Sequence, residues 1–376
     1  MLARYPLSMK YAFILLVLIL FFYGVITARE FLYPIVLGVL LGYLIYPIAC
    51  YLEKKGLPRI PASLLSILIF IFIGGSAILI IYNQTGRILD QLPVYRQSAL
   101  VNIDKMESII ESQFGLKDLR LVEFFRGRIK FIFEAGNDVM NKIFSNTAGI
   151  IFRLGILPVY MFLFLYYRTK LAYFILQIIP REDRRIGVKV LRAFSKVVSR
   201  YMGGISTVVI ILALLNSLGL LIIGVESPFV FGIISACFSF IPYFGTFIGG
   251  SIPFLFVLLT HNSPLVALKV ILLYLIVHFI ENNILTPNIV GNSLRLNPMV
   301  IIIGVIAGGT VWGVPGMFVI VPLLAMFNIM SENIRGLHAY SYLLGTSGTR
   351  KHAITGENIK MFWNRITTTR KKFKKR

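Results

Sequence analysis

The amino-acid sequence predicts an all-α, polytopic integral membrane protein: a helical bundle of about eight transmembrane segments. Hydrophobic residues make up 57% of the 376 residues and charged residues only 14%, whereas about a quarter of a soluble domain is charged. Several uncharged runs reach the roughly 20 residues that a helix needs to cross a bilayer. In the carboxyl-terminal half the runs exceed one span and contain clustered glycine and proline, which predicts broken or re-entrant helices there.

Residues 1–82 are predicted to form an amino-terminal segment that crosses the membrane three times. Apolar runs of about span length occupy residues 11–28, 32–52 and 62–82. The first run follows basic residues, as the apolar part of a signal peptide does, but it lacks an A-x-A cleavage site. We therefore expect it to be retained as the first helix.

Residues 83–147 differ from the rest because their charges nearly balance and their apolar residues recur at spacings of three and four. This periodicity predicts amphipathic helices, broken at Gly115, that form a helical hairpin. The parity of the preceding spans places the hairpin on the extracytoplasmic side. The apolar stripe has three candidate partners: the hairpin itself, a neighbouring subunit of a homo-oligomer, or the membrane surface. We favour the first two.

Residues 148–341 are predicted to form the membrane transport core, which begins with spans at 148–167 and 205–224. Between these spans lies an amphipathic segment at 181–200, directly after Pro180. We expect it to lie along the inner leaflet as a juxtamembrane helix, with its basic residues facing anionic lipid.

Positive charge sets the predicted orientation. The loop Arg168 to Arg200 carries nine Lys or Arg against two acids, and the basic tail at 342–376 ends in RKKFKKR. Both are cytoplasmic by the positive-inside rule, and the amino terminus, with Arg4 and Lys10, joins them. The formal net charge of +22 is therefore assigned to contact with membrane lipids rather than with nucleic acid.

Two stretches without charge are too long for single spans. There are 42 uncharged residues between Glu226 and Lys269 and 36 between Arg295 and Glu332, which as straight helices would measure about 63 and 54 Å. Helix breaks are expected at the glycines and prolines within them: Pro242, Gly245, Gly249, Gly250 and Pro253 in the first, and Gly308, Gly309, Gly313, Pro315 and Gly316 in the second.

Each stretch has two interpretations. It is either one broken span with an interfacial portion or a hairpin of two shorter or re-entrant helices. The two interpretations place residues 287–297 on opposite sides of the membrane, so that side stays open. For the glycines themselves, close packing of helices is a rival explanation to a helix break.

The segment at 278–298 combines ionisable and amide side chains within an apolar region. Glu281 is the carboxylate that lies well inside the apolar carboxyl-terminal half, and such a group normally faces a bundle interior or a water-filled cavity because its burial in lipid is costly. His278 lies three residues earlier, on the same helix face, so the two can form a pair whose charge changes in the physiological pH range.

The neighbouring polar residues extend this predicted transport site. They are Asn282, Asn283, Thr286 and Asn288, together with Pro287, which is expected to stop the helix and leave carbonyls unpaired. Together these groups can replace the water shell of a cation or of a small polyol. The alternative is a helix end at the membrane interface, where Glu, Asn and Pro act as ordinary caps and turn formers.

Two further polar residues have weaker claims. Arg295 is either a partner of Glu281 or an interfacial anchor that extends to the headgroups, and we favour the anchor. Asn216, within the predicted span at 205–224, is expected to make an interhelical hydrogen bond.

Three motifs carry a resemblance to a known family: FIPYFGTFIGGSIP at 240–253, ENNILTPNIVGNSLRLNP at 281–298 and GGTVWGVPGMFVIVPLLA at 308–325. From about Tyr201 to Ser341 the chain resembles the autoinducer-2 exporter family of bacterial membrane proteins. The resemblance implies a multi-pass protein of the bacterial inner membrane that exports a small hydrophilic solute, with autoinducer-2 as the family's named substrate. Exchange of Na⁺ or Li⁺ for protons is the second function that it implies.

The chain departs from the family pattern at two places. Members commonly carry a glutamine near the start of the fifth span, where this chain reads Met202, Gly203 and Gly204. They commonly carry another glutamine three residues before the glutamate, where this chain has His278. If those glutamines contact the substrate, this protein transports a different one.

Enzymatic and metal-binding functions find no support in the sequence. It contains no HExxH, GxSxG or Walker motif, and Cys50 and Cys237 have no metal-binding spacing. We therefore predict no enzyme activity, no cofactor and no metal site. A membrane scaffold that oligomerises through the external hairpin without transporting anything is the third function class.

Overall fold

The computed structural model describes residues 7–114, 127, 147–242, 244–261, 263–291 and 294–346. Every regular element of this part is helical, and six helices are long and apolar enough to cross a membrane. Shorter apolar helices accompany them. The predicted all-α, polytopic membrane bundle is therefore confirmed. The helices are α1 (Leu7–Thr27), α2 (Arg29–Lys54), α3 (Arg59–Asp90), α4 (Leu92–Phe114), α6 (Thr147–Ile178), η2 (Arg181–Asp183), α7 (Arg184–Ile223), α8 (Pro228–Phe238), α9 (Gly245–Thr260), α10 (Pro264–Ile280), η3 (Glu281–Val290), α11 (Pro298–Trp312), α12 (Val314–Asn333), η4 (Arg335–Leu337) and α13 (His338–Leu344).

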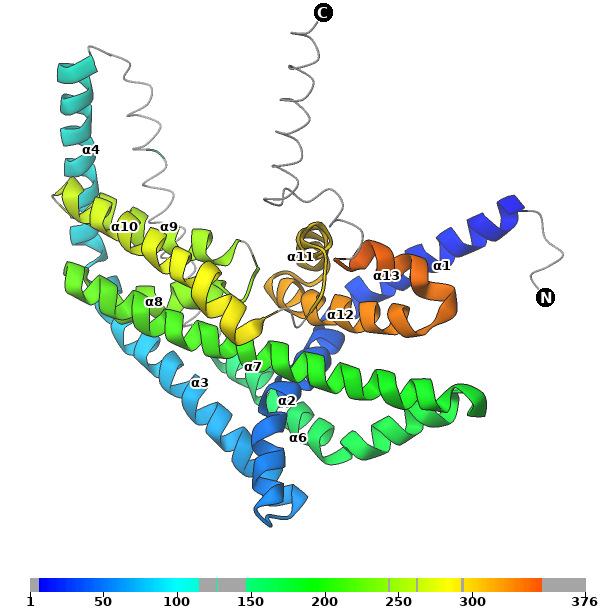
Figure 1. Cartoon of the computed structure of the whole chain (residues 1–376). Helices are drawn as coiled ribbons and strands as arrows, with labels where there is room; N and C mark the ends of the chain where they lie inside the picture. The colour runs from blue at the N-terminus through cyan, green and yellow to red at the C-terminus, as the bar shows by residue number, and fades with distance from the viewer. Residues whose placement is uncertain are drawn as a thin grey trace, which may run out of the picture.

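The helix α7 forms the long central element of the fold. It runs across the molecule and contacts α2, α8, α10, η3 and α12 (Figure 1). Its 40 residues join the predicted juxtamembrane helix and the predicted fifth span into one helix. No proline separates the two parts, and Gly204 lies in a close helix contact, where an added Cβ would be 3.2 Å from the Cα of Val290.

The first long uncharged stretch folds into a hairpin of α8 and α9. The chain turns at residues 239–244, which include Pro242, and α9 begins at Gly245. Gly249, Gly250 and Pro253 lie inside α9, so the breaks predicted at these three residues are corrected. The small size of the two glycines serves packing: a Cβ on Gly249 would lie 2.5 Å from the backbone oxygen of Ser235 in α8.

The second stretch is also a hairpin, formed by α11 and α12. Gly313 separates the two helices with a φ of 66°, a conformation that favours glycine. Gly308 and Gly309 lie inside α11, and Pro315 and Gly316 lie in the first turn of α12, which corrects the breaks predicted there. The interpretation of each stretch as a single broken span is therefore wrong.

The backbone does not stop at Pro287. The helix continues from α10 through a π-helical segment, η3, and ends only at Gly291. The predicted stop is wrong, because Pro287 lies inside this π-helical segment and not at its end.

The described part of the predicted external segment packs on helix α9. The Asn102 side chain in α4 donates hydrogen bonds of 2.9 Å to the carbonyl oxygens of Leu259 and His261 at the end of α9. The ring of Tyr95 lies 5.0 Å from that of Phe256, centroid to centroid. This face of α4 is thus covered by α9, a partner that we did not predict. Most of the predicted second helix, and all but the first residues of the basic tail, lie outside the described residues.

Close packing at Gly316 leads to a stability prediction. A Cβ there would lie 2.0 Å from the Gly308 carbonyl oxygen, so α11 and α12 would have to separate. We expect Gly316→Ala to lower the free energy of unfolding by about 1 to 3 kcal/mol. Thermal or denaturant unfolding of the purified protein in detergent measures the change.

The matched control is Gly74→Ala in α3, where nothing lies within 4 Å of an added Cβ. This variant should be as stable as the wild type or slightly more stable, because alanine favours helix more than glycine does. Equal stability of the two variants would contradict the role assigned to the contact between the hairpin helices.

Candidate functional site

A cavity of about 1080 Å³ lies where the turn of the α8–α9 hairpin meets η3, α7 and the loop after η3. This is the size of a small-molecule site, since ligand pockets measure roughly 300 to 1,000 Å³. Its lining combines polar side chains with apolar ones. The polar or charged lining residues are Tyr201, Ser239, Thr246, His278, Glu281, Asn282, Thr286, Arg295 and Thr346.

Glu281 is the buried charged group of this cavity, with 9% of its surface exposed. The hydroxyl of Thr246, in the first turn of α9, donates a hydrogen bond of 2.5 Å to its Oε2. A buried carboxylate needs such a donor, because burying a polar group without a hydrogen-bond partner costs roughly several kcal/mol. The hydrogen bond therefore joins the hairpin turn to the start of the π-helical segment.

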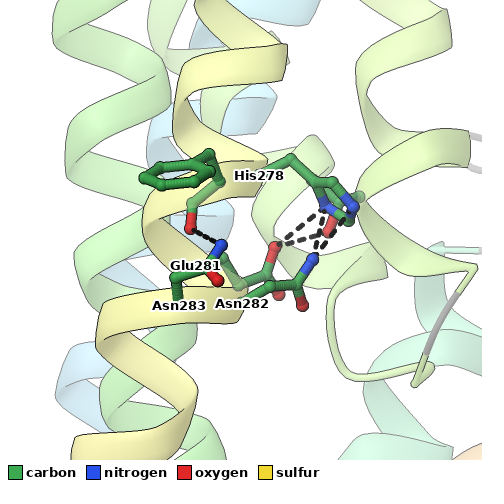
Figure 2. A network of polar contacts seen from close by, with 6 residues as sticks. His278, Glu281, Asn282 and Asn283 are labelled. Atoms are coloured by element: carbon green, nitrogen blue, oxygen red, sulfur yellow. Dashed lines mark hydrogen bonds and ion pairs between the residues drawn. The ribbon is translucent and has the colours of Figure 1, made fainter. Parts of the chain in front are cut away.

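His278 and Asn282 complete a small network beside the carboxylate (Figure 2). Nδ1 of His278 lies 3.9 Å from Oε2 of Glu281, and Nδ2 of Asn282 lies 2.9 Å from Nε2 of His278. If the amide donates to Nε2, the ring proton is left on Nδ1, which faces the carboxylate. The His278 side chain is 48% exposed.

The structure brings together only part of the predicted site. His278, Glu281, Asn282 and Thr286 line the cavity, and so does Pro242 from the hairpin turn. Figure 2 shows Asn283 on another side of the helix, where its amide donates to the Phe279 carbonyl oxygen at 2.9 Å. Pro287 and Asn288 are exposed and outside the cavity lining.

The π-helical repeat explains which residues reach the cavity. Its hydrogen bonds run from residue i to i+5, so the face of Glu281 returns after roughly five residues rather than four. Thr286 and Val290 therefore share the cavity with Glu281, whereas an α-helical repeat would have placed Asn288 there.

Several polar residues of the cavity did not figure in the predicted transport site, among them Thr246, Tyr201 and Ser239. Thr246 directly follows the Gly245 at which α9 begins, and a hydroxyl beside a predicted helix break is the feature that could have identified it. Arg295 also lines the cavity, but it makes no ion pair with Glu281 in the described part of the chain. The predicted hydrogen bond of Asn216 is not present: its Oδ1 is buried without a partner among the described residues.

A chain of hydrogen bonds fixes the hairpin beside the helix that carries Glu281. The hydroxyl of Tyr274 in α10 donates to Ser235 Oγ in α8 at 2.8 Å, and Ser235 Oγ donates to the Gly249 carbonyl oxygen in α9 at 2.6 Å. All three groups are buried. The turn of the hairpin is thereby held at a set position against Glu281.

Comparison with known proteins shows which kind of protein carries this cavity. The family model described as "AI-2E family transporter" matches residues 15–336. This chain belongs to the AI-2E transporter family. It is therefore a multi-pass membrane protein of a bacterial transporter family, as the three motifs predicted.

Individual relatives are similar to this chain over most of their lengths. YrrI of Bacillus subtilis (strain 168) is 30% identical over 316 residues, which cover 79% of this chain and 84% of YrrI. YueF of the same organism is 26% identical, over 80% of this chain and 84% of YueF. The AI-2 transport protein TqsA of Escherichia coli (strain K12) is 24% identical, over 90% of this chain and 96% of TqsA.

The hydrogen bond between Thr246 and Glu281 leads to a second stability prediction. Thr246→Val keeps the shape of the side chain but removes the donor to the buried carboxylate. We expect the free energy of unfolding to fall by about 1 to 3 kcal/mol, as for other hydrogen bonds to charged groups.

Thr207→Val is the matched control, because the exposed Thr207 hydroxyl donates only to the Gly203 carbonyl oxygen of its own helix, at 2.8 Å. It should change the free energy of unfolding by less than about 0.5 kcal/mol. Denaturant unfolding in detergent compares both variants with the wild type. A Thr246→Val protein as stable as the Thr207→Val protein would count against this contact.

Proposed function

We propose that this AI-2E transporter exports a small hydrophilic solute of the autoinducer-2 type as a secondary transporter, with the Glu281 cavity as its binding site. The observation that carries the proposal is a buried carboxylate held between the turn of one hairpin and a π-helical segment, on the wall of a cavity of about 1080 Å³. Secondary transporters commonly build their sites from such interrupted helices. The similarity of 90% of this chain to the AI-2 transport protein TqsA supports the choice of solute.

The groups on the cavity wall suit a polyol. The Glu281 carboxylate accepts hydrogen bonds from hydroxyl groups, and the side chains of Asn282 and Thr286 both donate and accept them. These groups would replace the water that a polar solute sheds on leaving solution. The apolar part of the lining, including Ile205 and Ile301, would exclude competing water.

The cavity extends toward the basic half of α7. Arg295 and Thr346 line it on that side, and Arg295 also faces Lys196 and Arg200 across a second cavity. At the opposite side, the hydrogen bonds among Tyr274, Ser235 and Gly249 hold the hairpin against α10. With the basic loops in the cytoplasm, as the positive-inside rule predicts, the solute would enter from the cytoplasm, which is the direction of export.

The carboxylate supplies a direct test. Glu281→Gln keeps the size of the side chain but removes its charge, so we expect flux of autoinducer-2 from liposomes containing the purified variant to fall about tenfold or more, a loss of roughly 1.4 kcal/mol. Glu182→Gln, which removes an exposed carboxylate in η2, should transport like the wild type.

Adjacent asparagines give a sharper comparison. Asn282→Ala removes a cavity group, whereas Asn283→Ala removes one that bonds to its own helix outside the cavity. Flux should therefore fall for Asn282→Ala and stay near the wild-type rate for Asn283→Ala. Equal effects of the two substitutions would place the solute elsewhere.

Exchange of Na⁺ or Li⁺ for protons is the second candidate, and the pair of His278 and Glu281 favours it. Their 3.9 Å separation lets one group gain or lose a proton as a cation leaves or binds beside the other. The Thr246 hydroxyl oxygen would add an oxygen ligand, the type that hard cations prefer.

Proton movement separates the two candidates. Cation exchange predicts that Na⁺ added to everted vesicles releases protons, and that both Glu281→Gln and His278→Gln abolish this release. Export of the solute alone predicts that vesicle pH does not respond to Na⁺ while autoinducer-2 flux depends on Glu281. A purified protein that moves neither autoinducer-2 nor Na⁺ in liposomes would contradict both and favour the scaffold.

A further inference from the structure

A second cavity, of about 440 Å³, lies between the amino-terminal half of α7 and the carboxyl-terminal end of α12. Lys189, Lys196 and Arg200 of α7 and Arg295 line it, with Glu332 as the acid. Four cations face one carboxylate, a formal excess of three positive charges. Arg295 belongs to a family motif and also lines the transport cavity, but neither accounts for the three cations of α7.

The three cations of α7 share one face of that helix. Lys189, Lys196 and Arg200 are separated by seven and four residues, and a helix of 3.6 residues per turn places such positions on one side. Within the part of the chain that the structure describes, neither these three cations nor Arg295 forms a salt bridge. Glu332 accepts a hydrogen bond of 3.3 Å from Asn328 Nδ2.

The fourth cation is held in place by the backbone. Arg295 has a φ of 48°, which residues with side chains rarely adopt. The segment after it is fixed to the end of α13, since the Asn297 N–H donates to the Leu344 carbonyl oxygen at 2.7 Å and Leu296 pairs with Gly345. A rare conformation that its surroundings enforce commonly marks a functional position.

A buried polar atom adds an independent observation. Asn328 lines the cavity and is only 2% exposed, yet its Oδ1 has no hydrogen-bond partner among the described residues. A ligand that carries a hydroxyl group next to its anionic group would supply the missing donor. Ala193, Val197 and Ile329 form an apolar wall beside these polar groups.

We propose that this second cavity is a phosphate-binding site, filled either by the headgroup of an anionic phospholipid or by a soluble phosphate. Arg and Lys are the residues that bind phosphate oxygens, Arg in a two-pronged geometry and Lys as a point charge. Basic pockets between membrane helices on the cytoplasmic side are typical sites for anionic headgroups. Because Arg295 lines both cavities, the bound phosphate lies next to the wall of the transport cavity.

The test compares two double substitutions with equal loss of charge in the purified full chain. Lys196→Gln with Arg200→Gln removes two cations of the site, whereas Lys170→Gln with Arg181→Gln removes two exposed cations outside it. Each protein is placed in phosphatidylcholine nanodiscs, and binding of fluorescent phosphatidylglycerol is titrated. The unfolding midpoint of each protein confirms that it is folded.

We expect the site variant to bind phosphatidylglycerol about tenfold or more weakly than the wild type, since each basic residue at the site contributes about fivefold to the affinity. The control variant should bind like the wild type, because the cations that it lacks lie outside the site. In a second arm, inorganic phosphate is titrated in pure phosphatidylcholine nanodiscs. Binding of phosphate that only the site variant loses would support the site and identify a soluble ligand. Equal binding by both variants in both arms, or no binding by the wild type in either, would overturn the proposal.

Discussion

The hydrogen bond from Thr246 to Glu281 is the contact on which the transport cavity depends. A buried carboxylate needs a polar partner, and the donor comes from the first turn of a different helix. That donor reaches Glu281 only because the chain between α8 and α9 turns back at residues 239–244. A continuous helix from α8 to α9 would carry Thr246 away from the carboxylate. The break in the hairpin and the burial of the acid are therefore two parts of one arrangement.

Small residues make this arrangement compact. Gly249 and Ser235 let α8 and α9 approach closely, and Gly308 and Gly316 do the same for α11 and α12. In a membrane, where lipid removes most of the hydrophobic drive for helix association, such close contacts carry much of the packing energy. The hydroxyl of Ser235 also accepts from Tyr274 and donates to Gly249, so one side chain fixes three helices around the carboxylate.

The sequence predicted the class of fold, the two interrupted regions and the central acid, because burial of charge and the length of a span are properties of composition and spacing. It predicted less of the site itself. Asn283 and Asn288 were predicted in the site because they are close to Glu281 in the chain, and the π-helical segment brings Thr286 to the cavity but leaves these two asparagines outside its lining. Thr246 lies 35 residues from Glu281 in the chain, so only the folded hairpin brings them together. The glycines of α9 and α11 could not be assigned to packing or to breaks, since both roles need the same small residue.

We propose that Glu281 faces a water-filled cavity inside the membrane rather than lipid or the headgroup layer. Labelling of single cysteines by a membrane-impermeant thiol reagent tests it most directly, in a protein whose Cys50 and Cys237 are replaced by serine. A cysteine at Thr286, on the cavity wall, should react and be protected by the transported solute, whereas one at Leu272, on the exposed apolar side of α10, should not react. A cysteine at Thr286 that is as unreactive as one at Leu272 would contradict the claim.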